Sequence, residues 1–242
     1  WPRIDAVISF FSNSDFVVGY KTKNQYRHFA YDQFIEHNDQ IHELDNYRNI
    51  FTQLFNIECD SSPELIAPPL NEKFCEDDFI LVHMWPGGYK SHFKEWNQGN
   101  WHKLFQKIIE DKYLIVLSGT NSDLQKNNYF DITFGKEKII NIAGECDLND
   151  LAGIIYQSSL VVSVNTGIAH MSAALGRPTL CLNGPTSPTR WGPIGKQVIN
   201  INSTKEGAGF LNLGFEYNRG PADTMEYISV ESVYNSLSTI IK

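Results

Sequence analysis

Apolar and polar positions follow the most regular pattern from about residue 79 onward, where short apolar runs alternate with amphipathic stretches. The apolar runs predict strands at 79–83, 113–118, 139–142, 160–164, 179–182 and 197–201. Apolar residues three and four positions apart predict helices at 101–109, 148–156 and 230–241. Strands that alternate with helices are typical of an α/β fold, so we predict a Rossmann-like, doubly wound parallel sheet.

The stretch 160–193 contains the most informative turn in the sequence. After the strand at 160–164, the chain enters a short helix that begins at Gly167 and ends before Gly176, its expected C-cap. Thr166 is placed to cap this helix, and His170 lies one turn further on the same face. Free amides at a helix start favour a phosphate, and Gly167 allows close approach. The alternative is an ordinary capped helix with a surface histidine.

The pattern is weaker before residue 70. Apolar runs predict strands at Ile4–Phe10 and Phe16–Tyr20, which either form a hairpin or belong to a shortened half-domain. Helical spacing predicts a helix at Asn46–Phe55. The prolines between 61 and 69 indicate a domain boundary near residue 70.

Composition and charge exclude several classes of protein. The net charge of −8 over 242 residues argues against a nucleic-acid partner. No apolar run approaches the roughly 18 residues of a membrane helix. The four cysteines have no metal-ligand spacing, which predicts reduced thiols in a cytoplasmic protein. They are Cys59, Cys75, Cys146 and Cys181.

Two further loops follow predicted strands and carry polar chemistry. The connection 84–100 contains Gly87-Gly88, Lys90, His92 and Lys94, and we expect a basic lid over a diphosphate; the alternative is a solvated surface loop. The loop 118–123 offers Asn121 or Asp123 as a ligand, although a glycine turn with capping polar residues explains it equally well.

A long, ordered set of residues resembles the C-terminal domain of glycosyltransferase family 9, the lipopolysaccharide heptosyltransferases. The resemblance is clear from about residue 79 to 201, and one departure is an asparagine where the family usually has aspartate. The matching residues are Asn165, Thr166-Gly167, His170, Ala173-Ala174, Gly176-Arg177-Pro178 and Gly184-Pro185-Thr186. Lys94 and Trp96 match a lysine and an aromatic residue in the donor loop of the family. His83 matches the histidine that ends a strand in the family.

The resemblance implies a GT-B architecture and an inverting transfer that needs neither a cofactor nor a metal. The donor would be a nucleotide-diphosphate sugar such as ADP-heptose, and the acceptor a lipopolysaccharide core or similar glycan. The implied location is cytoplasmic, with at most peripheral contact at the inner face of the membrane. The implied donor-binding residues are His83, Lys94, Asn121, Asn165, Thr166, Gly167, His170, Gly184 and Thr186. Residues 1–70 would be a remnant of the acceptor-side domain, 71–228 the nucleotide-sugar domain and 229–242 a closing helix.

The catalytic base is not identified by this reasoning. In the family it is an aspartate early in the N-terminal domain, and Trp1 begins too late for that loop. Asp5 and Asp15 are weak candidates because neither follows a glycine-rich turn. We therefore expect the chain as given, a fragment or processed product, to bind donor and transfer sugar poorly. Two alternatives stay open: a nucleotide-sugar epimerase, and a non-catalytic nucleotide-binding module, which Asn165 favours.

Overall fold

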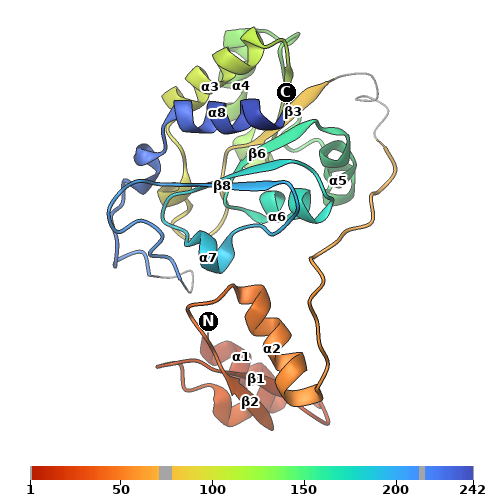
Figure 1. Ribbon diagram of the computed structural model, residues 1–242, viewed down its shortest axis with the longest axis vertical. Coiled ribbons are helices and arrows are strands. Elements are labelled where there is room, and N and C mark those ends of the chain that lie inside the picture. The colour runs from red at the N-terminus through yellow and green to blue at the C-terminus, as the bar shows by residue number, and fades with distance from the viewer. Residues whose placement is uncertain (1, 71–77, 213–215, 242) are drawn as a thin grey trace. The chain divides into compact units, whose positions relative to one another are not determined.

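The computed structural model describes residues 2–70, 78–212 and 216–241 (Figure 1). Contacts divide the chain into two compact units, Trp1–Ser61 and Ser62–Lys242. The boundary expected near residue 70 adjoins residues 71–77, which lie outside the described part, as does Cys75. The other three cysteines carry free thiols, and Cys181 is buried in a core strand as its apolar surroundings predicted.

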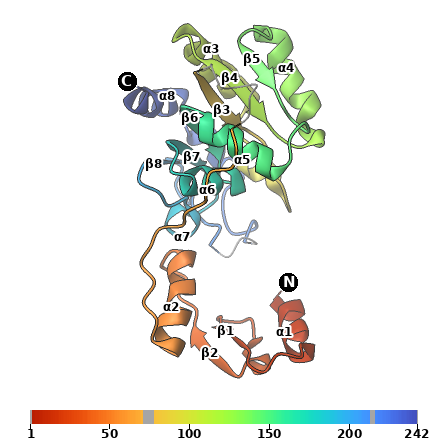
Figure 2. The ribbon, with the colours of Figure 1, turned by 90° about the vertical axis from the view of Figure 1, so that its right-hand side faces the viewer.

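The larger unit is built on one six-stranded sheet whose neighbouring strands all pair in parallel, in the order β5-β4-β3-β6-β7-β8 (Figures 1 and 2). Each predicted strand exists, and the bounds agree to within one residue at most ends. The strands are β3 (Phe79–His83), β4 (Leu114–Ser118), β5 (Ile139–Asn141), β6 (Leu160–Val164), β7 (Thr179–Asn183) and β8 (Val198–Asn202).

Helices cover both faces of this sheet, which confirms the doubly wound prediction. Along β3, Ile80 and Val82 enter one apolar cluster with α3, α4 and α8, whereas Phe79 and Leu81 enter another with α5 and α6. Because successive side chains of a strand point to opposite faces, a strand covered on both must be apolar throughout. The helices are α3 (Gln98–Glu110), α4 (Leu124–Phe134), α5 (Leu148–Gln157), α6 (Gly167–Ala174), α7 (Pro188–Trp191) and α8 (Val230–Ile240).

The strand order reverses direction between β3 and β6. From β3 the chain builds outward through β4 and β5, and then returns to add β6, β7 and β8 on the other side of β3. His83, the last residue of β3, is in register with Ser163 on β6 and Ser118 on β4. Open α/β sheets bind ligands beyond the carboxyl ends of the strands at such a switch point.

The smaller unit differs from the sequence prediction at its start. Residues expected to form a strand at 4–10 belong to helix α1 (Pro2–Phe11). Ile4, Ile8 and Phe11 are three or four positions apart, a helical spacing that a short apolar run conceals, and Asp5 lies in the first turn, where the helix dipole favours it.

The hairpin alternative is therefore wrong as well. β1 (Val18–Lys21) pairs in parallel with β2 (Gln33–Glu36), across a connection that holds a 3₁₀ turn at His28–Ala30. The predicted helix of this unit is confirmed as α2 (Glu43–Phe55).

Helix α4 was not predicted because its apolar residues form no helical stripe. Phe130 is buried against Phe105 of α3, with ring centroids 4.9 Å apart. Asn127 is buried one turn earlier, and its side-chain oxygen accepts a 2.7 Å hydrogen bond from the indole nitrogen of Trp85. Within the described ranges, none of the helices has both the length and the apolar character needed to cross a bilayer.

Candidate functional site

The predicted donor residues gather at the carboxyl edge of four neighbouring strands. His83 ends β3, Asn121 follows β4, the segment 165–170 follows β6, and Gly184 and Thr186 follow β7. The sheet order places these strands side by side as β4-β3-β6-β7. Parallel strands end at a common edge, so residues far apart in sequence become neighbours around the switch point.

The turn between β6 and α6 leaves backbone donors available. Thr166 occupies the N-cap position, but its side chain makes no capping hydrogen bond, contrary to the sequence expectation; its hydroxyl lies 3.2 Å from that of Ser163. Among the described residues, the amides of Gly167 and Ile168 donate no hydrogen bond. A Cβ added at Gly167 would meet nothing within 4 Å, and His170 is exposed on the same helix. The helix start is therefore open to an anion.

Asn165 has a structural role that explains its amide. It is 8% exposed, and its nitrogen donates to the side-chain oxygen of Asn183 at 2.7 Å and to the carbonyl of Trp191 at 3.0 Å. Asn183 in turn donates to the side-chain oxygen of Asn200 at 3.0 Å. Both partners of Asn165 are acceptors, so an ionised aspartate could not replace it in this network. The network ties the loop after β6 to β7, β8 and α7.

Lys94 brings a positive charge to this edge. It ends a 3₁₀ turn, Ser91–Lys94, labelled η3. Burial lowers the pKa of Lys94, while its electrostatic interaction with the thiol of Cys181 on β7 acts in the opposite direction. Across the part of the chain that the structure describes, the Lys94 ammonium forms no ion pair. A partly desolvated ammonium without a counter-ion is well suited to bind an anion.

The segment before Lys94 is packed against a distant loop. Lys90 has a left-handed backbone, with φ of 52°, and donates a 3.0 Å hydrogen bond to Asn218. Its ammonium lies 5.6 to 5.9 Å from the ring centroids of Tyr89, Phe93 and Tyr217, within cation–π range. This aromatic cluster fixes the start of η3, and through it the position from which Lys94 projects.

His83 is neutral at physiological pH. Burial lowers its pKa to about 4, against smaller opposing effects from Asp123 and from a hydrogen bond with the Trp85 backbone. Its Nδ1 lies 3.0 Å from the hydroxyl of Ser118. A neutral imidazole at the switch point can donate or accept a hydrogen bond without adding charge.

In the loop after β4, the contacts distinguish Asn121 from Asp123, the two candidate ligand-binding residues that the sequence left open. The carboxylate of Asp123 accepts hydrogen bonds from the amide and the hydroxyl of Thr120, at 2.8 and 2.7 Å. Asp123 is therefore engaged in a capping box. Asn121 is exposed, and its side chain packs over Gly144, which has a positive φ of 77°.

The loop after β7 contains a buried arginine that sequence reasoning missed. Gly184 is buried, and a Cβ there would collide with the side chain of Met225. The hydroxyl of Thr186 is buried without a hydrogen-bond partner among the described residues. Arg190 is 2% exposed and donates from Nε to the side-chain oxygen of Asn212 at 2.6 Å. Nothing in the local pattern indicates that a charged residue in this loop should be buried.

A cavity of about 600 Å³ in the same unit was not foreseen either, because it depends on α4. None of the predicted donor residues is among those that line it. The candidate acids of the smaller unit are exposed, and Asp5 pairs with Arg27 at 3.2 Å. The carboxyl edge of the sheet thus combines an unpaired ammonium, free amides and a neutral histidine, which together can bind and stabilise an anionic group.

The sequence and fold were compared with known proteins. A family model described as glycosyltransferase family 9 (heptosyltransferase) matches residues 5–210. Lipooligosaccharide heptosyltransferase 2 of Haemophilus ducreyi is 28% identical over 166 residues, which cover 66% of this chain and 47% of that protein. The chain thus spans about half the length of this relative.

Two solved structures share the fold. An E. coli ADP-heptose lipopolysaccharide heptosyltransferase II superposes with a TM-score of 0.74 at 19% identity, over 98% of this chain and 73% of the other. An E. coli heptosyltransferase solved with ADP superposes with a TM-score of 0.67 at 17% identity, over 90% of this chain and 62% of the other. The predicted α/β fold of GT-B type is confirmed.

Proposed function

The chain belongs to glycosyltransferase family 9, and on that premise we propose that it binds a nucleoside-diphosphate sugar at the carboxyl edge of its parallel sheet. The sugar is a heptose carried by ADP, as the names of its relatives suggest, and the acceptor is a lipopolysaccharide core or similar glycan. The reaction takes place at the cytoplasmic face of the membrane, where the chain makes at most peripheral contact.

The observation that carries this proposal is the unpaired Lys94 ammonium. Its lowered pKa means that burial disfavours the charged form, and no carboxylate in the described residues compensates for that cost. A diphosphate between Lys94 and the free amides of Gly167 and Ile168 would satisfy both groups. His170 and the neutral His83 stand at the same edge as further hydrogen-bonding groups.

The chemistry follows from these contacts. An acceptor hydroxyl oxygen attacks the anomeric carbon of the donor, and the bond from that carbon to the diphosphate oxygen breaks with its electron pair going to the leaving group. Negative charge therefore develops on the diphosphate, where the ammonium and amides stabilise it in the transition state. The hydroxyl proton passes to a base, which we leave unassigned.

Two measurements on the purified 242-residue chain test the proposal. Calorimetric titration with ADP should show one site. ADP-heptose incubated with a lipopolysaccharide core acceptor should release ADP slowly, as expected for this chain, and only when that acceptor is present. Sugar isomerisation without acceptor would instead indicate an epimerase, and binding without either reaction a nucleotide-binding module. Absence of binding for ADP, GDP and UDP alike would refute the proposed donor site.

A further inference from the structure

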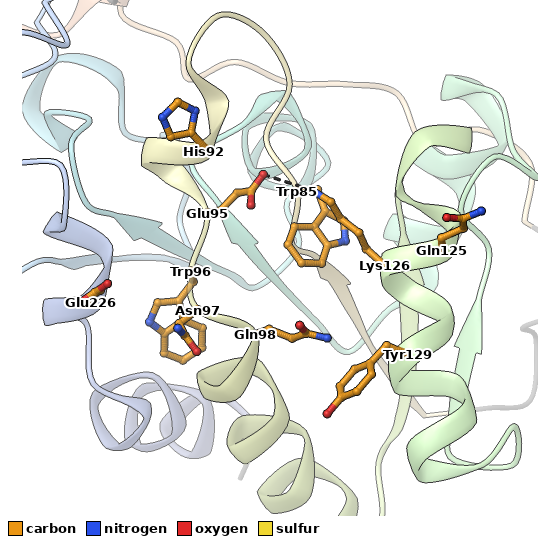
Figure 3. Close-up of a pocket in the computed structure, with 10 residues that line it drawn as sticks. All are labelled: Trp85, His92, Glu95, Trp96, Asn97, Gln98, Gln125, Lys126, Tyr129 and Glu226. Atoms are coloured by element: carbon orange, nitrogen blue, oxygen red, sulfur yellow. Dashed lines mark hydrogen bonds and ion pairs between the residues drawn. The ribbon is translucent and has the colours of Figure 1, made fainter.

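The cavity of about 600 Å³ lies between η3, the start of α3 and helix α4 (Figure 3). Its volume falls within the roughly 300–1,000 Å³ of small-molecule sites. It lies beside the loop that carries Lys94, yet Lys94 does not line it. The lining residues are Trp85, His92, Glu95, Trp96, Asn97, Gln98, Gln125, Lys126, Tyr129 and Glu226.

Aromatic rings form part of the wall and are held in place. Trp85 is 8% exposed and its indole nitrogen donates to Asn127 at 2.7 Å, so the ring is fixed and only a small part of it reaches the cavity. The Lys126 ammonium lies 4.4 Å from the centroid of the Trp85 ring. Tyr129, on the next turn of α4, is 47% exposed at the cavity. The exposed ring of Tyr129 therefore offers the main apolar surface for the C–H groups of a ligand.

Polar groups complete the lining. Glu95 accepts from Lys126, with oxygen and nitrogen 3.4 Å apart. Within the described residues, the side-chain amides of Gln98 and Gln125 make no hydrogen bond. Figure 3 shows the Gln98 side chain lying between Trp96 and Tyr129. A carboxylate and unpaired amides that line one cavity can accept from and donate to the hydroxyls of a ligand.

The charges of the lining disfavour an anionic ligand. Glu95 and Glu226 contribute two carboxylates, against a single ammonium from Lys126 that already pairs with Glu95. A phosphate would meet net negative charge, in contrast to the edge where Lys94 lies. An entirely apolar ligand would desolvate Glu95 and Gln98 without compensation.

We propose that Trp85, Glu95, Gln98, Lys126 and Tyr129 form a binding site for a neutral saccharide unit, separate from the diphosphate site. A pyranose presents C–H groups on its faces and hydroxyls at its rim, and so matches an exposed tyrosine ring in a cavity that amide and carboxylate groups also line. The inference goes beyond the proposed function and does not depend on it. Since Lys94 and Glu95 are consecutive, a saccharide here contacts the loop that positions Lys94.

Saturation-transfer NMR with methyl α-D-mannopyranoside and methyl α-D-glucopyranoside, at millimolar concentration and with the full 242-residue chain, tests this. We expect transfer from protein to at least one glycoside, and an affinity about five-fold lower for Tyr129→Ala and for Gln98→Ala. Both side chains are exposed, so the variants should fold. Tyr156→Ala on α5, which removes a tyrosine that is 39% exposed elsewhere in the unit, is the matched control and should bind like the parent.

Two competition experiments complete the test. Saturating ADP should leave the glycoside signal in place, because the two sites are separate, and inorganic phosphate should not displace it. The inference is overturned by absent transfer for both glycosides, by Tyr129→Ala and Gln98→Ala binding like the parent, or by displacement with ADP or phosphate. Because ADP binding is measured independently, failure of this site is distinguishable from failure of the donor site.

Discussion

Replacing Lys94 with methionine removes its ammonium while keeping a long, flexible and apolar side chain in the same space. If the ammonium contacts the diphosphate, the variant loses a charge-assisted hydrogen bond worth roughly 1.5–3 kcal/mol. Affinity for ADP should then fall roughly 10- to 100-fold, since each 1.4 kcal/mol is a factor of ten. Calorimetry at low ionic strength measures this change directly.

The same variant should be at least as stable as the parent. The pKa of Lys94 is lowered by burial, which means that the folded protein carries a desolvation cost for the charged form of this side chain. That cost disappears in Lys94→Met, and the thermal midpoint should stay equal or rise. Lys103→Met, at an exposed position of α3, is the matched control and should change neither quantity.

Loss of affinity together with retained stability is the signature of a group held in place for a ligand. Should Lys94→Met bind ADP within two-fold of the parent, the diphosphate lies elsewhere. A clear drop in thermal midpoint would mean that Lys94 supports the fold, and that its burial carries no information about a ligand.

Three further predictions concern the same edge of the sheet. The pKa of His83 is lowered from 6.5 to about 4, so its contribution to stability is present above pH 6.5 and is lost as the pH falls through 4. Between pH 6.5 and 4, the free energy of unfolding measured in urea should therefore fall by about 3 kcal/mol less for His83→Gln than for the parent. Asn165→Asp should lower the free energy of unfolding at pH 7 by about 2–4 kcal/mol, because a carboxylate would face the two acceptors on Asn183 and Trp191. If chemical denaturation shows equal stability for the variant and the parent, the amide network is disproved. ADP should bind with similar affinity in EDTA and in magnesium, since Lys94 and the α6 amides provide the positive charge, and calorimetry showing strict metal dependence would contradict this.

Much of the larger unit could be predicted from the sequence because its signals are local. Strands such as β3 and β6 are buried on both faces and are therefore apolar at four of their five positions, with only His83 and Ser163 polar, a pattern that an amphipathic helix does not show. The stripe of α3 and the Asp147 cap of α5 mark helices in the same direct way. Their alternation implies a parallel sheet, and the carboxyl ends of its strands imply where the loops converge.

Local signals failed where the chain depends on distant partners. Residues 4–10 are apolar enough for a strand or a helix, and their spacing alone did not decide between the two. Helix α4 is required by the crossover from β4 to β5, and its buried Asn127 is satisfied by Trp85, 42 positions away in sequence. A buried polar residue inside a helix weakens the pattern that sequence reasoning uses.

The sequence by itself determined the strands of the larger unit, most of its helices and the loops at the ligand-binding edge, because hydrophobic period and capping chemistry are properties of neighbouring residues. Only the tertiary structure decided the electrostatic state of those loops. The neutral His83, the desolvated and unpaired Lys94 and the donor role of Asn165 arise from burial and from partners on other strands. The same holds for the cavity beside α4, because desolvation and enclosure come from packing, which brings together residues that the chain keeps far apart.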